Sequence, residues 1–218
     1  MPFSERSIRK DILEAGRRLY ERGMVASNDG NISARLPGGR ILITATGVCK
    51  GDLVDAHLLT VDAEGNLLRG KYKPTSEMKM HLAVYKARSD VAAIVHAHPP
   101  KATAFAVARQ PLDLVTLPEV IFALGSIQLC EYATPTTADL PASVVRHIRL
   151  GDAMLLENHG ALTVGKDVME AYFNMETLEH FAGITLNARI LGGEHILTEE
   201  EKQALIKVRS DVFGKSGM

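Results

Sequence analysis

Short runs of apolar and β-branched residues, each closed by turn-forming residues, constrain the fold of this chain more than any other feature of its sequence. Runs of this length on either side of glycine, proline or asparagine are typical of β-hairpins. Three such pairs are 31–36 with 40–46, 58–62 with 66–69, and 154–157 with 161–164. The sequence therefore predicts a sheet rich in hairpins. Two further runs, 91–98 and 127–132, are predicted to be strands.

Helical patterns lie at both ends of the chain and between the hairpins. Ser4 is placed to cap the first helix, and Thr198 with Glu201 forms a capping box before the last. The helix that opens near Pro74 is expected to bury Met78, Leu82 and Tyr85. No repeat or linker divides the chain, so a single domain over residues 1–218 is expected. The predicted helices are 4–23, 74–88, 101–108, 140–149, 167–191 and one after residue 198.

Composition excludes several classes of protein. The chain has 218 residues, 46% of them hydrophobic and 23% charged, with a net charge of −1. A near-neutral chain has no overall field for nucleic acid or an anionic membrane. No apolar run approaches the ~20 residues that span a bilayer. The N-terminus lacks a signal-peptide pattern, so we expect a cytoplasmic protein whose two cysteines, Cys49 and Cys130, are reduced.

Three histidines occupy positions in the sequence that would suit metal ligands. His96 and His98 end an apolar strand, and residues two apart on a strand project from the same face. His159 lies in a tight turn after another apolar strand. Three neutral imidazoles fill three positions of a zinc site and leave the fourth for water or substrate. The residues alone leave open the alternative that these are packed core or loop histidines.

Glu77, in the first turn of the helix that opens near Pro74, is the candidate acid or base. Its carboxylate would also complement the helix dipole with no catalytic role, so both interpretations stand. A catalytic carboxyl needs a pKa raised towards neutrality, which partial desolvation supplies. His81, one turn later, is interpreted as a packing residue, with a fourth metal ligand as the alternative.

Two clusters of small polar residues suit a phosphate group. Residues 28–31 and 46–47 lie at strand-end turns, and Thr75 and Ser76 lie at a helix start. Hydroxyls, amides and backbone N–H groups in such places bind phosphate oxygens without a large positive charge. Each cluster is also ordinary turn or capping chemistry.

Taken in order, these segments resemble the class II aldolase/adducin family, and most closely its L-fuculose-1-phosphate aldolase-like branch. The resemblance covers about residues 5 to 190 and is carried by the ordered motifs 27–33, 43–47, 74–77, 95–98 and 157–160. It implies an α/β fold, a three-layer α/β/α sandwich with a mainly antiparallel central sheet. It also implies a homotetramer with active sites at subunit interfaces.

Position by position, the resemblance implies roles for the motif residues. Glu77 becomes the catalytic carboxylate, and the metal ligands become His96, His98 and His159, with Zn²⁺ favoured and Mn²⁺, Co²⁺ or Fe²⁺ as alternatives. In this branch a tyrosine from a neighbouring subunit enters the active site. The corresponding segment of this chain is 116–120, and it contains no tyrosine. Glu119 is the candidate acid or base there. The implied phosphate pocket is formed by Asn31, Thr46, Gly47, Thr75 and Ser76.

The activity so implied is the reversible cleavage of a ketose 1-phosphate to dihydroxyacetone phosphate and a small aldehyde. L-Fuculose 1-phosphate or a related deoxypentulose 1-phosphate would be the substrate. A pentulose-phosphate 4-epimerase, or a sugar-phosphate decarboxylase or dehydratase, is the alternative within the fold. Epimerases of this kind usually carry aspartate where this chain has Glu77, which favours the aldolase. A metal-free, adducin-like binding protein is the third hypothesis.

Overall fold

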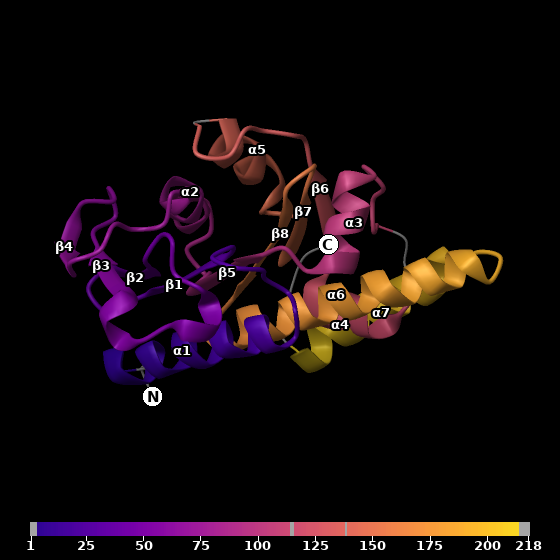
Figure 1. Ribbon diagram of the computed structural model, residues 1–218. Helices are drawn as coiled ribbons and strands as arrows, with labels where there is room; N and C mark the ends of the chain where they lie inside the picture. Colours follow the sequence, from indigo (N-terminus) through magenta and orange to yellow (C-terminus); the bar gives the residue numbers. More distant parts are fainter. Residues whose placement is uncertain (1–3, 114–115, 138, 214–218) are drawn as a thin grey trace.

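The computed structural model describes residues 4–113, 116–137 and 139–213, and these form an eight-stranded sheet with helices on both faces (Figure 1). The strand order is β4-β3-β2-β1-β5-β8-β7-β6. Neighbouring strands pair antiparallel except β6 and β7, which are parallel. The strands are β1 (Asn31–Arg35), β2 (Ile41–Thr44), β3 (Leu58–Val61), β4 (Leu67–Arg69), β5 (Ala93–Ala97), β6 (Ile127–Cys130), β7 (Ala153–Leu156) and β8 (Gly160–Gly165).

All three predicted hairpins are present, as β1–β2, β3–β4 and β7–β8. The expected three-layer α/β architecture with a mostly antiparallel sheet is confirmed. The helices are α1 (Glu5–Glu21), α2 (Met78–Ala87), α3 (Pro100–Val107), α4 (Pro118–Leu124), α5 (Asp139–His147), α6 (Val168–Ile190) and α7 (Glu199–Phe213), with 3-10 turns η1 (Lys50–Asp52) and η2 (Asp55–His57).

Helix starts follow the predicted capping residues. The Ser4 hydroxyl accepts the backbone N–H of Ser7 at 3.1 Å, which caps α1. At the last helix, the Thr198 N–H donates to the Glu201 carboxylate at 2.8 Å while the Thr198 hydroxyl accepts from the Glu201 N–H at 3.3 Å. None of the helices in the described ranges is both long and apolar enough to cross a membrane.

One expectation about helices was wrong in part, and one helix was not predicted. In α2, Met78 and Leu82 are only half-buried, because they lie over the β3–β4 turn, where a Cβ placed on Gly65 would come within 2.9 and 3.0 Å of them. The short helix α4 was not predicted, since seven residues carry too little periodicity to mark a helix. The side chains that α2 does bury are Met80, His81, Val84 and Tyr85.

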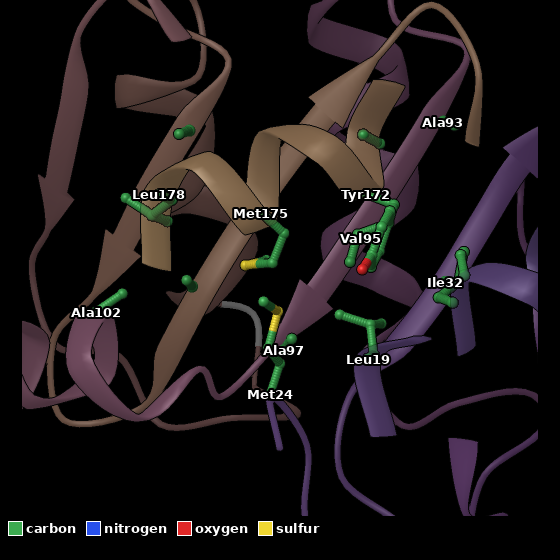
Figure 2. Close-up of a cluster of buried hydrophobic side chains, with 14 of the residues drawn as sticks. Leu19, Met24, Ile32, Ala93, Val95, Ala97, Ala102, Tyr172, Met175 and Leu178 are labelled. Carbon is green, nitrogen blue, oxygen red and sulfur yellow. The ribbon is translucent and has the colours of Figure 1, made fainter. Parts of the chain in front are cut away.

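The core lies in two layers, one on each face of the sheet. On one face, side chains of α1, α3 and α6 pack on the sheet; Figure 2 shows Met175 and Leu178 of α6 together with Val95 and Ala97 of β5. On the other face, α2 and α5 cover alternate residues of the same strands, such as Ile94. Strand β5 is buried on both faces, and its neighbours position the site.

Three central strands bring distant residues together at one edge of the sheet, the edge formed by the strand ends where β5 finishes and β1 and β8 begin. In the register, Asn31 at the start of β1 faces His96 near the end of β5, and His96 faces Leu162 of β8. Because β5 runs antiparallel to both neighbours, its end lies beside the start of each. The β7–β8 turn that carries His159 therefore lies at the same edge as the residues that follow β5.

Candidate active site

The three predicted histidines come together at this edge. Their ring centroids are 5.1 Å apart for His96 and His98, 4.7 Å for His96 and His159, and 5.3 Å for His98 and His159. One nitrogen of each ring lies within 4.8 Å of the other two, a spacing that could hold a metal ion. Residues far apart in the chain thus form one cluster of nitrogen ligands.

Hydrogen bonds at the outer ring nitrogens orient two of these imidazoles. His96 Nδ1 lies 2.9 Å from the Ala161 carbonyl oxygen, which can only accept, so Nδ1 carries the proton. His98 Nδ1 lies 3.4 Å from an Asp29 carboxylate oxygen. The two Nε2 atoms face each other at 3.3 Å. Such outer hydrogen bonds are typical of metal-binding histidines, and this donor set fits a divalent cation.

Burial controls the charge of these rings. It lowers the pKa of His159 to about 4, with the neighbouring His96 adding to the effect, and it also lowers the pKa of His98. For His96 burial acts in the same direction, but the Glu77 carboxylate outweighs it and raises the pKa. Neutral imidazole is the form that binds a metal, so two of the three rings are already in that state.

Glu77 lies directly before α2 and is 8% exposed. Its Oε2 accepts a hydrogen bond from Asn31 Nδ2 at 2.9 Å and lies 3.0 Å from His96 Nε2, while its Oε1 lies 3.3 Å from His159 Nε2. Burial raises the pKa of this carboxyl, but His96, His159 and Asn31 together lower it by more than burial raises it. The net pKa therefore lies below its ordinary value. The expected rise towards neutrality was therefore wrong: the imidazoles outweigh desolvation.

A cavity of about 150 Å³ opens beside the cluster. The Thr46 backbone N–H is already donated to the Lys73 carbonyl at 3.0 Å, so Thr46 offers its hydroxyl to a ligand. Among the residues that the structure describes, no lysine or arginine lines the cavity. The walls include all five predicted phosphate-binding residues, Asn31, Thr46, Gly47, Thr75 and Ser76, together with Glu77 and His98.

Two glycines allow the backbone to approach the histidines closely. A Cβ on Gly30, whose φ is +74°, would lie 2.8 Å from the His96 carbonyl oxygen. A Cβ on Gly160 would lie 2.5 Å from His98 Cδ2 and 2.7 Å from the Ala97 carbonyl oxygen. All three distances are shorter than those of real Cβ atoms, so both positions need glycine for packing, and the positive φ of Gly30 favours glycine as well.

Lys50 was missed by the sequence analysis. Its side chain is 1% exposed, and its Nζ donates to the carbonyl oxygens of Asn28, at 3.2 Å, and Val48. These carbonyls belong to the two loops that form the cavity, so one buried ammonium links both. Burial lowers its pKa, while Cys49 and Asp29 act in the opposite direction. A lysine among turn residues normally indicates an exposed side chain, so no sequence signal marks it.

Two other predicted residues lie apart from the cluster. His81 is fully buried, and its ring nitrogens contact Asn31 Oδ1 at 2.5 Å and Ser33 Oγ at 2.7 Å, which leaves neither for a metal. It is buried in the packed interior, as expected, and does not serve as a fourth ligand. Glu119 lies exposed in the first turn of α4 and does not line the cavity.

Comparisons with known proteins identify the family. The family model described as Class II Aldolase and Adducin N-terminal domain matches residues 10–186. A relative from Methanococcus maripaludis (strain C7), named L-fuculose phosphate aldolase, is 40% identical over 164 residues, covering 75% of this chain and 88% of its own. A relative from Haemophilus influenzae, named 3-oxo-tetronate 4-phosphate decarboxylase, is 35% identical over 175 residues, covering 78% and 83%.

Among solved structures, one named L-fuculose 1-phosphate aldolase superposes with a TM-score of 0.87 at 28% identity, covering 94% of this chain and 97% of its own. Family model, relatives and structure agree with the ordered motifs, and the chain belongs to the class II aldolase and adducin family.

Proposed function

We propose that this chain is a metal-dependent class II aldolase that reversibly cleaves a ketose 1-phosphate to dihydroxyacetone phosphate and a small aldehyde. L-Fuculose 1-phosphate or a related deoxypentulose 1-phosphate is the substrate. The observation that carries the proposal is the position of Glu77, within 3.3 Å of two of three converging imidazoles and on the wall of a cavity suited to phosphate.

In this proposal His96, His98 and His159 hold the cation, and zinc is favoured because three imidazoles leave one open position. Manganese, cobalt or iron would fit the same ligands. When bound, a divalent cation here supplies positive charge next to the negative charge that develops as the carbon–carbon bond breaks. Acidification opposes binding, because a proton on His96, favoured by Glu77, competes with the metal.

The chain's own residues bind the phosphate and move the proton. The hydroxyls of Thr46, Thr75 and Ser76, the Gly47 backbone and the Asn31 amide hold the phosphate group, and the buried Lys50 contributes positive potential beneath the loops. Glu77 rests as a carboxylate, the form that removes the proton from carbon in the synthesis direction. In cleavage the carboxylate first takes up a proton from solvent and then delivers it to carbon.

We assign the remaining proton transfer to a second subunit. The hydroxyl on the carbon that becomes the aldehyde must lose a proton, and Glu119, on the exposed side of α4, is the candidate acceptor for a neighbouring active site. A homotetramer of single-domain chains would supply it. Apolar side chains exposed at the end of α6, with Leu191 87% exposed, support burial against other subunits. Free thiols at Cys49 and Cys130 support a cytoplasmic location.

A second candidate is a sugar-acid phosphate decarboxylase, favoured by the 35% identity to the Haemophilus influenzae relative. Loss of carbon dioxide from a 3-oxo acid also leaves negative charge beside the cation, so the same residues suit it. An epimerase is less favoured, because Glu77 stands where those enzymes usually have aspartate. A metal-free binding protein would leave the convergence of three imidazoles without a use.

The test is a substrate panel with purified protein loaded with defined divalent metals. We expect dihydroxyacetone phosphate from L-fuculose 1-phosphate or a shorter ketose 1-phosphate, measured with a coupled dehydrogenase. Release of carbon dioxide from 3-oxo-tetronate 4-phosphate, with no cleavage of any ketose 1-phosphate, would favour the decarboxylase. A folded protein that binds no divalent metal would contradict both.

Glu77→Gln tests the assigned proton carrier. We expect turnover to fall by about 10²- to 10⁴-fold, the usual effect of removing an acid–base group, while metal content stays at the wild-type value. Glu64→Gln, at an exposed position in the β3–β4 turn, is the matched control and should behave as wild type. Near-normal turnover in Glu77→Gln with metal bound would show that another group carries the proton.

A further inference from the structure

A continuous series of buried hydrogen bonds runs from Tyr85, in the last turn of α2, to the candidate catalytic carboxylate. The Tyr85 hydroxyl lies 2.8 Å from Ser33 Oγ, which lies 2.7 Å from His81 Nδ1. On the other side of the ring, His81 Nε2 lies 2.5 Å from Asn31 Oδ1, and Asn31 Nδ2 lies 2.9 Å from Glu77 Oε2. Every member is at most 8% exposed, so water does not compete for these contacts.

The donors in this series of hydrogen bonds can be assigned one after another, starting from Glu77. A carboxylate only accepts, so Asn31 must turn its NH₂ group to Glu77 and its oxygen to His81. That oxygen only accepts, so His81 Nε2 carries the ring proton. Burial lowers the pKa of His81 to about 3, so the ring is neutral and Nδ1 is an acceptor. The Ser33 hydroxyl then donates to Nδ1 and accepts from Tyr85.

We propose that His81 is a positioning residue that acts on Glu77 through Asn31. Its Nε2–H holds the amide of Asn31 in the one orientation that donates to Glu77 Oε2, and Ser33 and Tyr85 hold the tautomer that makes this possible. The expected effect of His81 on turnover rests on the proposed catalytic role of Glu77. The orientation of the Asn31 amide is independent of that role.

The alternative orientation shows why the histidine matters. With its amide reversed, Asn31 would present its oxygen to the Glu77 carboxylate, and two acceptors would face each other in a buried site. An apolar side chain of similar size at position 81 would fill the same space but would leave Asn31 Oδ1 buried without a donor. Either change costs free energy on the scale of a lost buried hydrogen bond. Without the His81 donor, Glu77 would be the one remaining side chain of this series that orients the amide, and the amide would lose the second contact that fixes its position.

Paired variants separate this role from simple packing. His81→Phe keeps a ring and removes both nitrogens, and we expect kcat to fall about 10- to 100-fold, as for outer partners of metal sites, with metal content changed less than about twofold. His81→Gln restores an N–H donor and should recover most of the loss. Adding Asn31→Leu to His81→Phe should cost no more than Asn31→Leu alone, since His81 acts only through Asn31.

Additive losses in that double variant, or a rise in KM with unchanged kcat, would overturn the proposal. A measurement on the wild-type protein decides the orientation without any activity. Ring ¹⁵N NMR should show His81 as the Nε2–H tautomer with an unprotonated Nδ1 between about pH 5 and pH 9. An Nδ1–H tautomer or a charged ring would overturn the proposal even in an active enzyme. The expected tautomer would stand even if no ketose phosphate were cleaved.

Discussion

Gly160→Ala tests whether the geometry of the histidine cluster depends on the glycine that follows His159. The new Cβ would lie 2.5 Å from His98 Cδ2, whereas ordinary contact begins at 3.4 Å. The His98 ring must therefore move by about 0.9 Å, because the other close atom, the Ala97 carbonyl oxygen, belongs to the buried strand β5. Zinc–nitrogen bonds are about 2.0–2.1 Å long, so a displacement of this size removes the ring from the coordination shell.

We expect zinc affinity to fall about 10- to 100-fold, measured by competition with a chromophoric chelator at fixed pH. Overpacking should also lower the free energy of unfolding by about 1–3 kcal/mol, measured by urea denaturation of the metal-free protein. The matched control is Gly165→Ala at the other end of β8, where a Cβ would lie 2.5 Å from the Ala171 backbone nitrogen, away from the cluster. It should lose similar stability and keep its zinc affinity within about twofold.

Two results would refute this reasoning. Wild-type zinc affinity in a folded Gly160→Ala protein would mean that His98 is not a ligand. Equal loss of affinity in both variants would mean that general destabilisation, and not the position of one ring, controls metal binding.

Two further predictions concern buried groups near the site. Lys50→Met removes the donor to the Asn28 and Val48 carbonyls. We expect KM for the phosphorylated substrate to rise about tenfold with a smaller fall in kcat, and the free energy of unfolding to fall by about 1–3 kcal/mol. An unchanged KM in steady-state assays would contradict the role of Lys50 at the phosphate loops. Burial raises the pKa of Cys130 to about 12, well above pH 8, so its thiol stays protonated, and iodoacetamide at that pH should modify the half-buried Cys49 first. Peptide mass spectrometry measures the order, and earlier modification of Cys130 in folded protein would contradict it.

Features that depend on neighbours in the chain were predictable from the sequence. The hairpins at residues 31–46 and 58–69 follow from turn residues that join adjacent strands, and the caps at Ser4 and Thr198 follow from contacts within four residues. The set of residues around the site was also readable, because its motifs are short and occur in a fixed order. Their functional roles remain predictions for the assays above.

Features that depend on distant contacts were not predictable. Of the three side chains that α2 was expected to bury, Tyr85 is buried, while Met78 and Leu82 are half-buried and pack at the margin of the core beside the turn at Gly65. The pKa of Glu77 was expected to rise with burial, and it falls because His96 of β5 and His159 of the β7–β8 turn lie beside the carboxylate. Nothing local distinguishes Lys50 from an exposed turn lysine.

The order of residues along the chain thus specifies which chemical groups are available: three imidazoles, one carboxylate and two sets of phosphate-binding groups. Folding specifies how they act on one another, since the β1–β5–β8 register sets Asn31 opposite His96 and brings the turn carrying His159 to the same edge. The physical reason is the separation along the chain between the groups that interact. Turns and caps are satisfied within a few residues, whereas burial, charge and the direction of a hydrogen bond depend on atoms that only the packed sheet brings together.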